Sequence, residues 1–347
     1  MILFLGLLIF SFIVSSILIV PFIDLLYKFK LTRRKEAPKK GEGKVPLFDK
    51  MHDWKAGTPI GGGILIIFLV CIYYLILFPI LKRMGVYITS VYPFRDELNI
   101  IFFTFISFGV LGLYDDIVKL FGKPEKGPMG LRFGITRRVK FLLQILVAGT
   151  IGSMLYINLG IDLVHIPLFG VNIHLGWLYI PFAAFVILAF SNAYNITDGL
   201  DGLAAGLLMI CLFAFWMLSA TILDTTLTIF LSLWIGAIIA FLYFNVFPAR
   251  IWMGDAGALS FGATLAVVGL LIGKIFALVF IGGLFLLEVS TSLIQIYGIR
   301  IRKRRFFKIA PLHLWLQAKG WAEPKIVARA WLAGMMLAIM GIWLALV

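Results

Sequence analysis

Long runs of apolar residues, separated by short polar segments, recur along the whole chain. The runs approach the roughly 20 residues that a helix needs to cross a bilayer, and they lack the alternation that is typical of membrane β-strands. The pattern predicts an all-α polytopic integral membrane protein with about ten transmembrane helices. The predicted spans are residues 3–27, 60–80, 98–114, 139–158, 177–194, 203–221, 227–246, 257–272, 275–298 and 327–346.

We interpret residues 1–347 as a single transmembrane domain. The run at 1–20 has no basic stretch before it and no small-residue cleavage site, so it is predicted to be the first span rather than a signal peptide. Short apolar runs on either side of Phe169 and Gly170 predict a small external hairpin at residues 162–175.

The composition agrees with this class. Hydrophobic residues make up 62% of the chain and charged residues only 14%, whereas a soluble domain carries about a quarter charged residues. The two cysteines, Cys71 and Cys211, lie in apolar runs without the spacing of a disulfide framework or a metal site. They are interpreted as small hydrophobic residues.

Positive charge is concentrated in alternate loops. The net charge is +14, and 27 of the 31 Lys and Arg residues lie in the loops at 28–55, 115–140, 245–257 and 299–329. Cytoplasmic loops carry such an excess, so these loops and the turn at 192–202 are predicted to be cytoplasmic, with both termini outside. The charge therefore indicates topology and an anionic lipid or substrate, not nucleic acid. Loop 28–55 is also rich in Gly and Glu and is predicted to be mobile.

The most polar stretch between two apolar runs is residues 191–206. Within it Asn192 and Asn195 are three residues apart, as are Asp198 and Asp201, so each pair would share one face if this segment were helical. A carboxylate in a membrane helix costs about 2.5–3.5 kcal/mol on insertion scales, so such residues usually have a function. The alternative is a polar turn whose carboxylates are solvated or cap helix ends.

Further carboxylates adjoin other predicted helix ends. Asp115 and Asp116 close the third span, where a helix C-terminus disfavours anions, so the pair requires a cation such as Lys119 or a divalent metal. Asp255 precedes the eighth span, where it could instead cap the helix. Glu288, inside the ninth span, indicates a packed polar contact or a site.

Two other features each leave two interpretations open. The glycines at 61–63 suit either a flexible hinge or a loop that lies against a phosphate-bearing ligand. The Arg and Lys cluster in segment 299–329 suits either a membrane-surface anchor or a phosphate-rich substrate.

In combination, the motifs resemble those of the polyprenyl-phosphate N-acetylhexosamine-1-phosphate transferases, over nearly the whole chain from His52 onward. They are Lys55-x-Gly-Thr-Pro, Asp115-Asp116, Asn195-x-Thr-Asp-Gly-Leu-Asp201, Phe247-Pro-Ala-x-x-Trp252-Met-Gly-Asp255, Ala310-Pro-Leu-His313 and Lys319-Gly-Trp321. Ile60 stands where the family usually has Thr, and His313-Leu-Trp315 stands where it usually has three His. The tail Lys319-Gly-Trp-Ala-Glu-Pro-Lys325 favours the members that use UDP-MurNAc-pentapeptide.

This resemblance implies ten membrane helices with a cytoplasmic active site in the bacterial inner membrane. It implies transfer of a phospho-sugar from UDP-MurNAc-pentapeptide to undecaprenyl phosphate, with Mg²⁺ as cofactor, giving lipid I and UMP in peptidoglycan synthesis. The implied catalytic residues are Asp115 (the candidate base), Asp116 and Asp255, and Asp255 is also the implied Mg²⁺ ligand. The implied substrate-binding residues are Lys55, Lys119, Lys140, Asn192, Asn195, Asp198, Leu200, Asp201, Asn245, Trp252, Gln295 and His313.

Two alternative functions and the oligomeric state stay open. A WecA-like enzyme of the same family would use UDP-GlcNAc as the donor, and a homodimer is an alternative to a monomer. A non-enzymatic lipid or ion transporter would place charges and broken helices near the bilayer midplane. The aspartates map instead to predicted cytoplasmic helix ends, which favours an enzyme that joins two anionic substrates with the help of cations.

Overall fold

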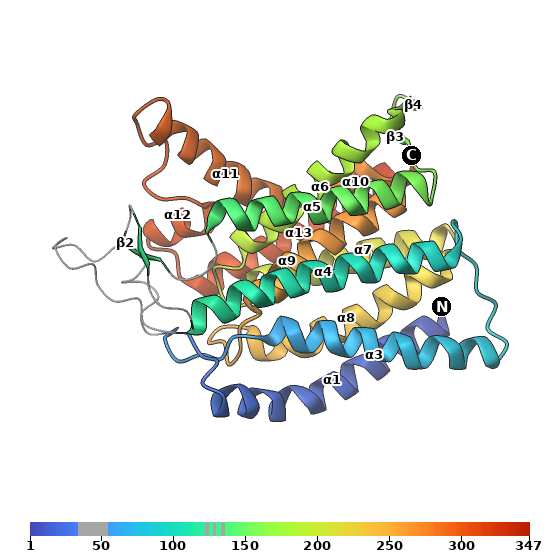
Figure 1. Cartoon of the computed structure of the whole chain (residues 1–347), viewed down its shortest axis with the longest axis horizontal. Helices are drawn as coiled ribbons and strands as arrows, with labels where there is room; N and C mark the ends of the chain where they lie inside the picture. Colours follow the sequence, from blue (N-terminus) through green and yellow to red (C-terminus); the bar gives the residue numbers. More distant parts are fainter. Residues whose placement is uncertain (34–54, 122–124, 128–129, 133–135) are drawn as a thin grey trace.

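The computed structural model of the chain is a bundle of long helices that run from one end of the molecule to the other (Figure 1). It describes residues 1–33, 55–121, 125–127, 130–132 and 136–347. Most of the loop at 28–55, predicted to be mobile, lies outside these residues.

The apolar runs form the long helices, as the hydrophobic pattern predicts. Among the described residues, nine helices are long and apolar enough to cross a membrane, or ten if one bent pair is counted as a span. The predicted all-α membrane architecture is therefore confirmed. The nine are α1 (Ile2–Lys28), α3 (Gly62–Arg83), α4 (Phe94–Phe121), α5 (Arg137–Ile157), α6 (Tyr179–Thr197), α7 (Leu203–Thr221), α8 (Thr225–Asn245), α9 (Gly254–Leu271) and α13 (Glu323–Leu346).

The ninth predicted span, residues 275–298, is not one straight helix. It is divided into α10 (Ile275–Ile281) and α11 (Gly283–Arg300), which meet at a bend of 76°. A Cβ atom on Gly282 would lie only 2.3 Å from the ring of Phe190, so the bend packs against α6 more closely than a larger residue would allow. Beyond the bend, α11 leans away from the rest of the bundle (Figure 1).

The two ends of the bundle differ. Both termini lie at one end (Figure 1), together with strands β3 (Leu163–Ile166) and β4 (Val171–His174). These strands pair antiparallel, which confirms the predicted hairpin. The opposite end carries the C-terminal end of α4, the N-terminal end of α5 and the connections 198–202, 246–253 and 301–322, the last of which contains α12 (Leu312–Ala318). We call it the basic end.

A second strand pair was not predicted. β1 (Glu125–Gly127) and β2 (Gly130–Arg132) pair antiparallel within the connection between α4 and α5. Their sequence has no alternation of apolar and polar residues, so the pattern gave no signal for them.

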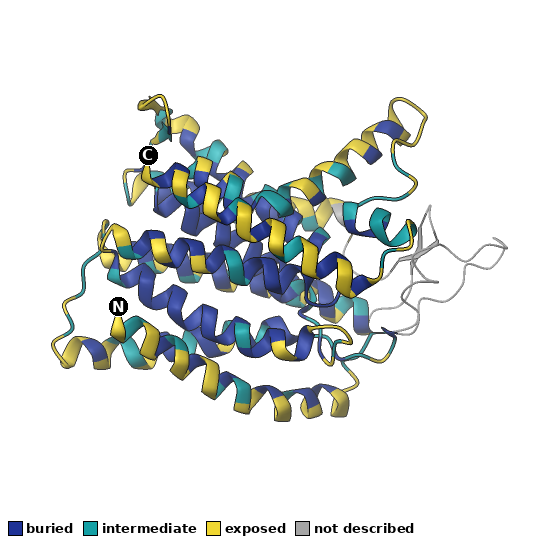
Figure 2. Cartoon of the chain, turned by 180° about the vertical axis from the view of Figure 1, so that it is seen from behind, coloured by how far each residue is buried: buried dark blue, intermediate teal, exposed yellow. Residues whose placement is uncertain are grey.

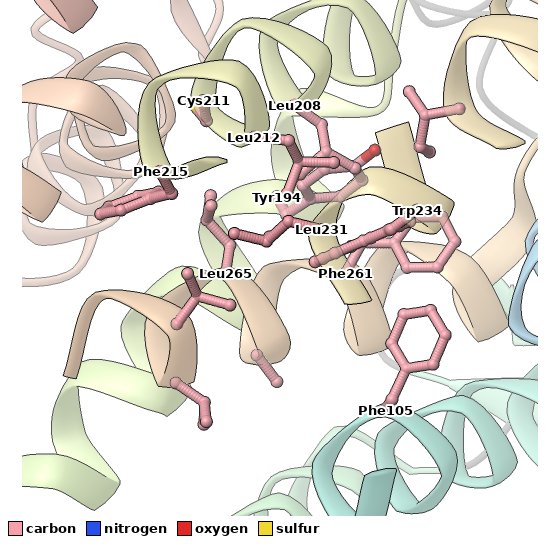
Figure 3. Close-up of a cluster of buried hydrophobic side chains, with 14 of the residues drawn as sticks. Phe105, Tyr194, Leu208, Cys211, Leu212, Phe215, Leu231, Trp234, Phe261 and Leu265 are labelled. Carbon is pink, nitrogen blue, oxygen red and sulfur yellow. The ribbon is translucent and has the colours of Figure 1, made fainter. Parts of the chain in front are cut away.

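The centre of the bundle is formed by α8 and α9. About nine-tenths of each of these spans is buried (89%), whereas only 22% of the α1 span is buried, and the outer helices expose their apolar faces (Figure 2). Figure 3 shows the aromatic cluster inside, where Phe105 stacks on Phe261. The ring centroid of Trp234 lies 5.2 Å from that of Phe105 and 5.5 Å from that of Phe261. This packed core fixes the helices whose polar ends form the candidate site.

Glycines let four of these helices, α3, α4, α8 and α9, approach closely at the basic end. A Cβ on Gly112 of α4 would lie 2.1 Å from the carbonyl oxygen of Asp255, and one on Gly63 of α3 would lie 2.3 Å from the Cα of Gly257. Gly62 likewise leaves no room for a Cβ beside the ring of Phe241. Gly62 and Gly63 thus pack α3 against α8 and α9. A flexible hinge and a loop against a phosphate-bearing ligand both stay predictions for glycines 61–63.

Candidate active site

Two lysines bridge the first two carboxylates of the site. Lys119 Nζ lies 3.0 Å from Asp115 Oδ2 and 2.7 Å from Asp255 Oδ2. Lys140, in the first turn of α5, lies 2.7 Å from Asp115 Oδ2 and also contacts Asp255 Oδ2. The Asp115 side chain is 3% exposed and that of Asp255 is 17% exposed. The acidic pair was predicted to require a cation. For Asp115, Lys119 and Lys140 supply that positive charge.

Asp116 has a different role from its neighbour. Its Oδ1 and Oδ2 atoms accept hydrogen bonds from the backbone N–H groups of Asp255 and Ala256, each at 3.0 Å. Asp116 therefore caps the first turn of α9, a role considered above for Asp255. Gly254 has a φ of +79°, and a Cβ there would lie 2.8 Å from Asp116 Oδ2, so this contact requires glycine.

The structure corrects the predicted end of the third span and decides between the two alternatives for residues 198–201. α4 continues to Phe121, so the acidic pair lies inside the helix rather than at its end. α6 stops at Thr197, so Asp198 and Asp201 lie in a turn and do not share a helix face. Membrane helices can extend beyond their apolar run where polar side chains find partners, as Asp115 does here.

The end of α6 contributes amide and carboxyl groups. Asn195 Nδ2 donates to Asp255 Oδ1 at 3.3 Å. Asp198 follows as the C-cap, and burial, together with the negative charges of Asp255, Asp201 and Asp116, raises its pKa to about 7. These surroundings therefore disfavour the charged form of Asp198.

Asn192 lies one turn before Asn195 and is held by a residue that was not predicted. Its Nδ2 donates to the carbonyl of Leu188 at 2.9 Å and to Gln144 Oε1 at 3.0 Å. Because a carbonyl only accepts, these contacts fix which amide atom of Asn192 is the nitrogen. Gln144, one turn beyond Lys140 on α5, is buried, and a single polar residue inside an apolar run gave little signal of this contact.

Lys55 is enclosed by two carboxylates. Its Nζ lies 2.7 Å from Asp201 Oδ1 and 2.6 Å from Glu323 Oε1, and all three side chains are buried. Glu323, the first residue of α13, was not predicted, because an acidic residue before a membrane helix resembles an ordinary helix start.

The loop before α9 carries Trp252, one of the implied substrate-binding residues. Two cations lie near the Trp252 ring. The Arg33 guanidinium is 4.8 Å from the ring centroid, and Lys55 Nζ is 5.7 Å from it. Asn245 joins this loop to the 198–202 turn, since its Oδ1 accepts from Gly202 N and its Nδ2 donates to Ile251 O. Leu200 is buried in that turn.

His313 and Gln295 bond to different parts of the chain. His313 Nδ1 lies 3.1 Å from Glu288 Oε2, so Glu288 makes the polar contact that was one of its two predicted roles. The Nε2 atom of His313 faces Gly199, where a Cβ would lie 2.5 Å away. Gln295 uses both amide atoms to hold the backbone of Phe307, each at 2.9 Å, and so fixes the segment that follows α11.

The carboxylates of the site offer oxygen ligands for a cation. Within the described ranges, no group of three or more His, Cys, Asp and Glu side chains is arranged to hold a metal. Mg²⁺ beside phosphates usually takes only one or two carboxylates and keeps several waters, so it does not need such a cage. Asp255 is the more exposed of the two lysine-bridged carboxylates and has suitable oxygen atoms, so it fits this kind of site.

Comparison with known proteins identifies the family. The model of glycosyl transferase family 4 matches residues 98–273, which contain most of α4 and all of α5 to α9. The chain belongs to glycosyl transferase family 4. The resemblance inferred from the motifs is thereby confirmed.

Relatives of this family 4 transferase match over nearly its whole length. A phospho-N-acetylmuramoyl-pentapeptide-transferase of Clostridium perfringens (strain 13 / Type A) is 34% identical over 320 residues, which cover 92% of this chain and 91% of the relative. The enzymes of that name from Shouchella clausii (34%, 96% and 93% covered) and Bacillus subtilis (32%, 96% and 94% covered) are similarly close. The chain is therefore a multi-span membrane enzyme, a phosphoglycosyl transferase.

Proposed function

We propose that the protein transfers phospho-MurNAc-pentapeptide from UDP-MurNAc-pentapeptide to undecaprenyl phosphate, giving lipid I and UMP for peptidoglycan synthesis. The relatives, which cover more than nine-tenths of the chain, support this donor and the phosphotransferase activity. The observation that carries the proposal is the cluster in which Lys119 and Lys140 bridge Asp115 and Asp255. Such a cluster at helix ends suits two anionic substrates, one of which arrives from the bilayer.

The reaction is a displacement at phosphorus. An oxygen of the undecaprenyl phosphate attacks the β-phosphorus of the donor, and the bond from that phosphorus to the oxygen bridging to the α-phosphorus breaks. UMP leaves with the electron pair, and the new bond completes the lipid diphosphate. Lys119 and Lys140 offset the negative charge of the approaching phosphates, and Asp115 is the candidate base for a proton that remains on the acceptor phosphate.

Asp255 would hold Mg²⁺ in this proposal, and the cation would neutralise charge on the phosphoryl oxygens of the donor. Asn195 and Lys140 orient the Asp255 carboxylate, and Asp116 fixes the helix turn that carries it. Positioning and charge are most of what a phosphoryl centre requires, since the reacting bonds belong to the substrates.

The proposed location is the bacterial inner membrane, with the basic end in the cytoplasm and both termini outside. The excess of Lys and Arg in the loops of the basic end supports this orientation. A soluble UDP-sugar would then reach the site from the cytoplasm.

A UDP-GlcNAc-using enzyme is the second candidate, because Leu314 and Trp315 stand where the family usually has His. Purified protein with undecaprenyl phosphate and Mg²⁺ should release UMP from UDP-MurNAc-pentapeptide at least about a hundredfold faster than from UDP-GlcNAc. Faster UMP release from UDP-GlcNAc would show that UDP-GlcNAc is the donor instead. Release of UMP from neither donor would refute the proposed activity.

We expect Trp252→Ala to weaken the use of the donor more than that of the lipid. Base–aromatic stacking contributes about 1–3 kcal/mol, so losing the indole face should raise the KM for the UDP-sugar at least about fivefold. Steady-state kinetics with each substrate varied in turn would measure this, and Trp252→Phe, which keeps an aromatic face, is the matched control. Equal increases in both KM values would indicate that Trp252 only packs the loop.

A further inference from the structure

One motif has no role in the function proposed above. The tail at 319–325 precedes α13, and its Glu323 is the first residue of that helix. Glu323 lies in the polar network of the basic end, where its Oε1 accepts from Lys55 Nζ at 2.6 Å and from the backbone N–H of Asp201, also at 2.6 Å.

The charges of this network are buried together. The side chains of Lys55, Asp201 and Glu323 are 2%, 3% and 7% exposed. One ammonium group thus faces two carboxylates, and a buried charge that loses a partner is strongly unfavourable. Because Glu323 also binds the backbone of Asp201, it fixes the turn as well as the lysine.

The network adjoins Trp252, on which the base of the donor is expected to stack. Lys55 Nζ lies 5.7 Å from the ring centroid of Trp252. Asp201 Oδ2 accepts from the backbone N–H of Ala249, in the loop that leads to that tryptophan. The lysine-bridged pair Asp115 and Asp255, which lies at the reacting phosphates in the proposed reaction, has different lysine partners, Lys119 and Lys140.

We propose that Glu323 is a positioning residue for the nucleotide of the donor, which holds Lys55 and Asp201 in place beside Trp252. The identity of the donor rests on the proposed function. By this account α13 contributes to donor affinity through its first residue, whereas the bridging lysines of the Asp115 and Asp255 cluster come from α4 and α5.

Glu323→Gln tests the role of the charge, because it keeps the size and one acceptor atom. It should raise the Kd for UDP, measured by calorimetry on the purified protein, at least about tenfold, which corresponds to about 1.4 kcal/mol. The KM for the donor should rise similarly, whereas kcat and the KM for undecaprenyl phosphate should change less than about threefold. Glu323→Asp, which keeps the charge, should recover part of the lost affinity.

A double variant tests the proposed partner. In a Lys55→Met background, Glu323→Gln should add less than about threefold to the Kd for UDP, because the contact is already lost. Asp96→Asn is the matched control, since Asp96 is also an acidic residue in the first turn of a membrane helix, at the opposite end of the molecule. It should bind UDP as the unmodified protein does.

The proposal is overturned if Glu323→Gln binds UDP within about twofold of the unmodified protein. It is also overturned if kcat and both KM values worsen in parallel with a lower Tm, because that result indicates a structural role. Failure of the proposed function can be distinguished from failure of the proposed role of Glu323. A protein that binds UDP but releases no UMP from either donor lacks that activity, and the UDP affinities of the variants still decide the role of Glu323.

Discussion

Asp255→Asn should lower the rate of UMP release at least about a hundredfold while the protein still inserts and keeps its Tm within a few degrees. Removing one group that stabilises charge in a transition state commonly costs about 2.7–4 kcal/mol. Asp255 is bonded to Lys119, Lys140 and Asn195, so the amide would lose both the charge and the alignment of these groups. Steady-state UMP release from purified protein measures the effect.

The neighbouring carboxylates give a graded comparison. Asp115→Asn should lower the rate of UMP release by a similar factor, because both lysines also contact Asp115. Asp116→Asn should lower both turnover and Tm, since one of the two N–H groups that Asp116 caps would then face an amide nitrogen. The control is Asp162→Asn, whose carboxylate contacts His174 beside the hairpin at the opposite end. Near-normal rates in all three site variants would mean that the carboxylates are structural.

Gly112→Ala should have the second large effect, although it changes no polar group. The new methyl group would lie 2.1 Å from the carbonyl oxygen of Asp255, so α4 and α9 must separate. Overpacking of this kind costs about 1–3 kcal/mol of stability. It should also move the Asp115 carboxylate away from Asp255 and reduce turnover at least about tenfold, since small displacements of catalytic groups are costly.

Gly149→Ala is the matched control for Gly112→Ala. Gly149 lies on α5, and nothing in the described structure lies within 4 Å of the position that its Cβ would take. Alanine also has the higher helix propensity, so this variant should keep its turnover and its Tm or gain slightly in Tm. Unchanged Tm and turnover in Gly112→Ala would show that the contact of α4 with α9 does not position the site.

The fold could be predicted well because each span is a continuous apolar run. The break at Gly282 could not be predicted, since the residues on both sides are apolar and the bend depends on the close contact with Phe190. The same limit applies to the end of α4. Hydropathy places the boundary before Asp115, whereas the lysines that neutralise Asp115 let the helix continue.

The site could be predicted in part. Motifs brought out the residues that carry unusual charge in apolar surroundings, and the structure joins most of them at one end of the bundle. Their partners were missed where a residue has an ordinary explanation in its own segment. Glu323 resembles a helix-start acid, and Gln144 resembles an isolated polar residue, although one binds Lys55 and the other binds Asn192.

The central claim is the transfer of the donor's β-phosphate to the lipid, and a donor labelled at that phosphate tests it most directly. Purified protein with UDP-MurNAc-pentapeptide carrying ³²P in the β-phosphate, undecaprenyl phosphate and Mg²⁺ should move the label into the lipid extract. One UMP should appear in the aqueous phase for each labelled lipid, and Asp255→Asn should abolish both signals. Label that stays in water as UDP or inorganic phosphate, or that enters the lipid without release of UMP, would contradict the account.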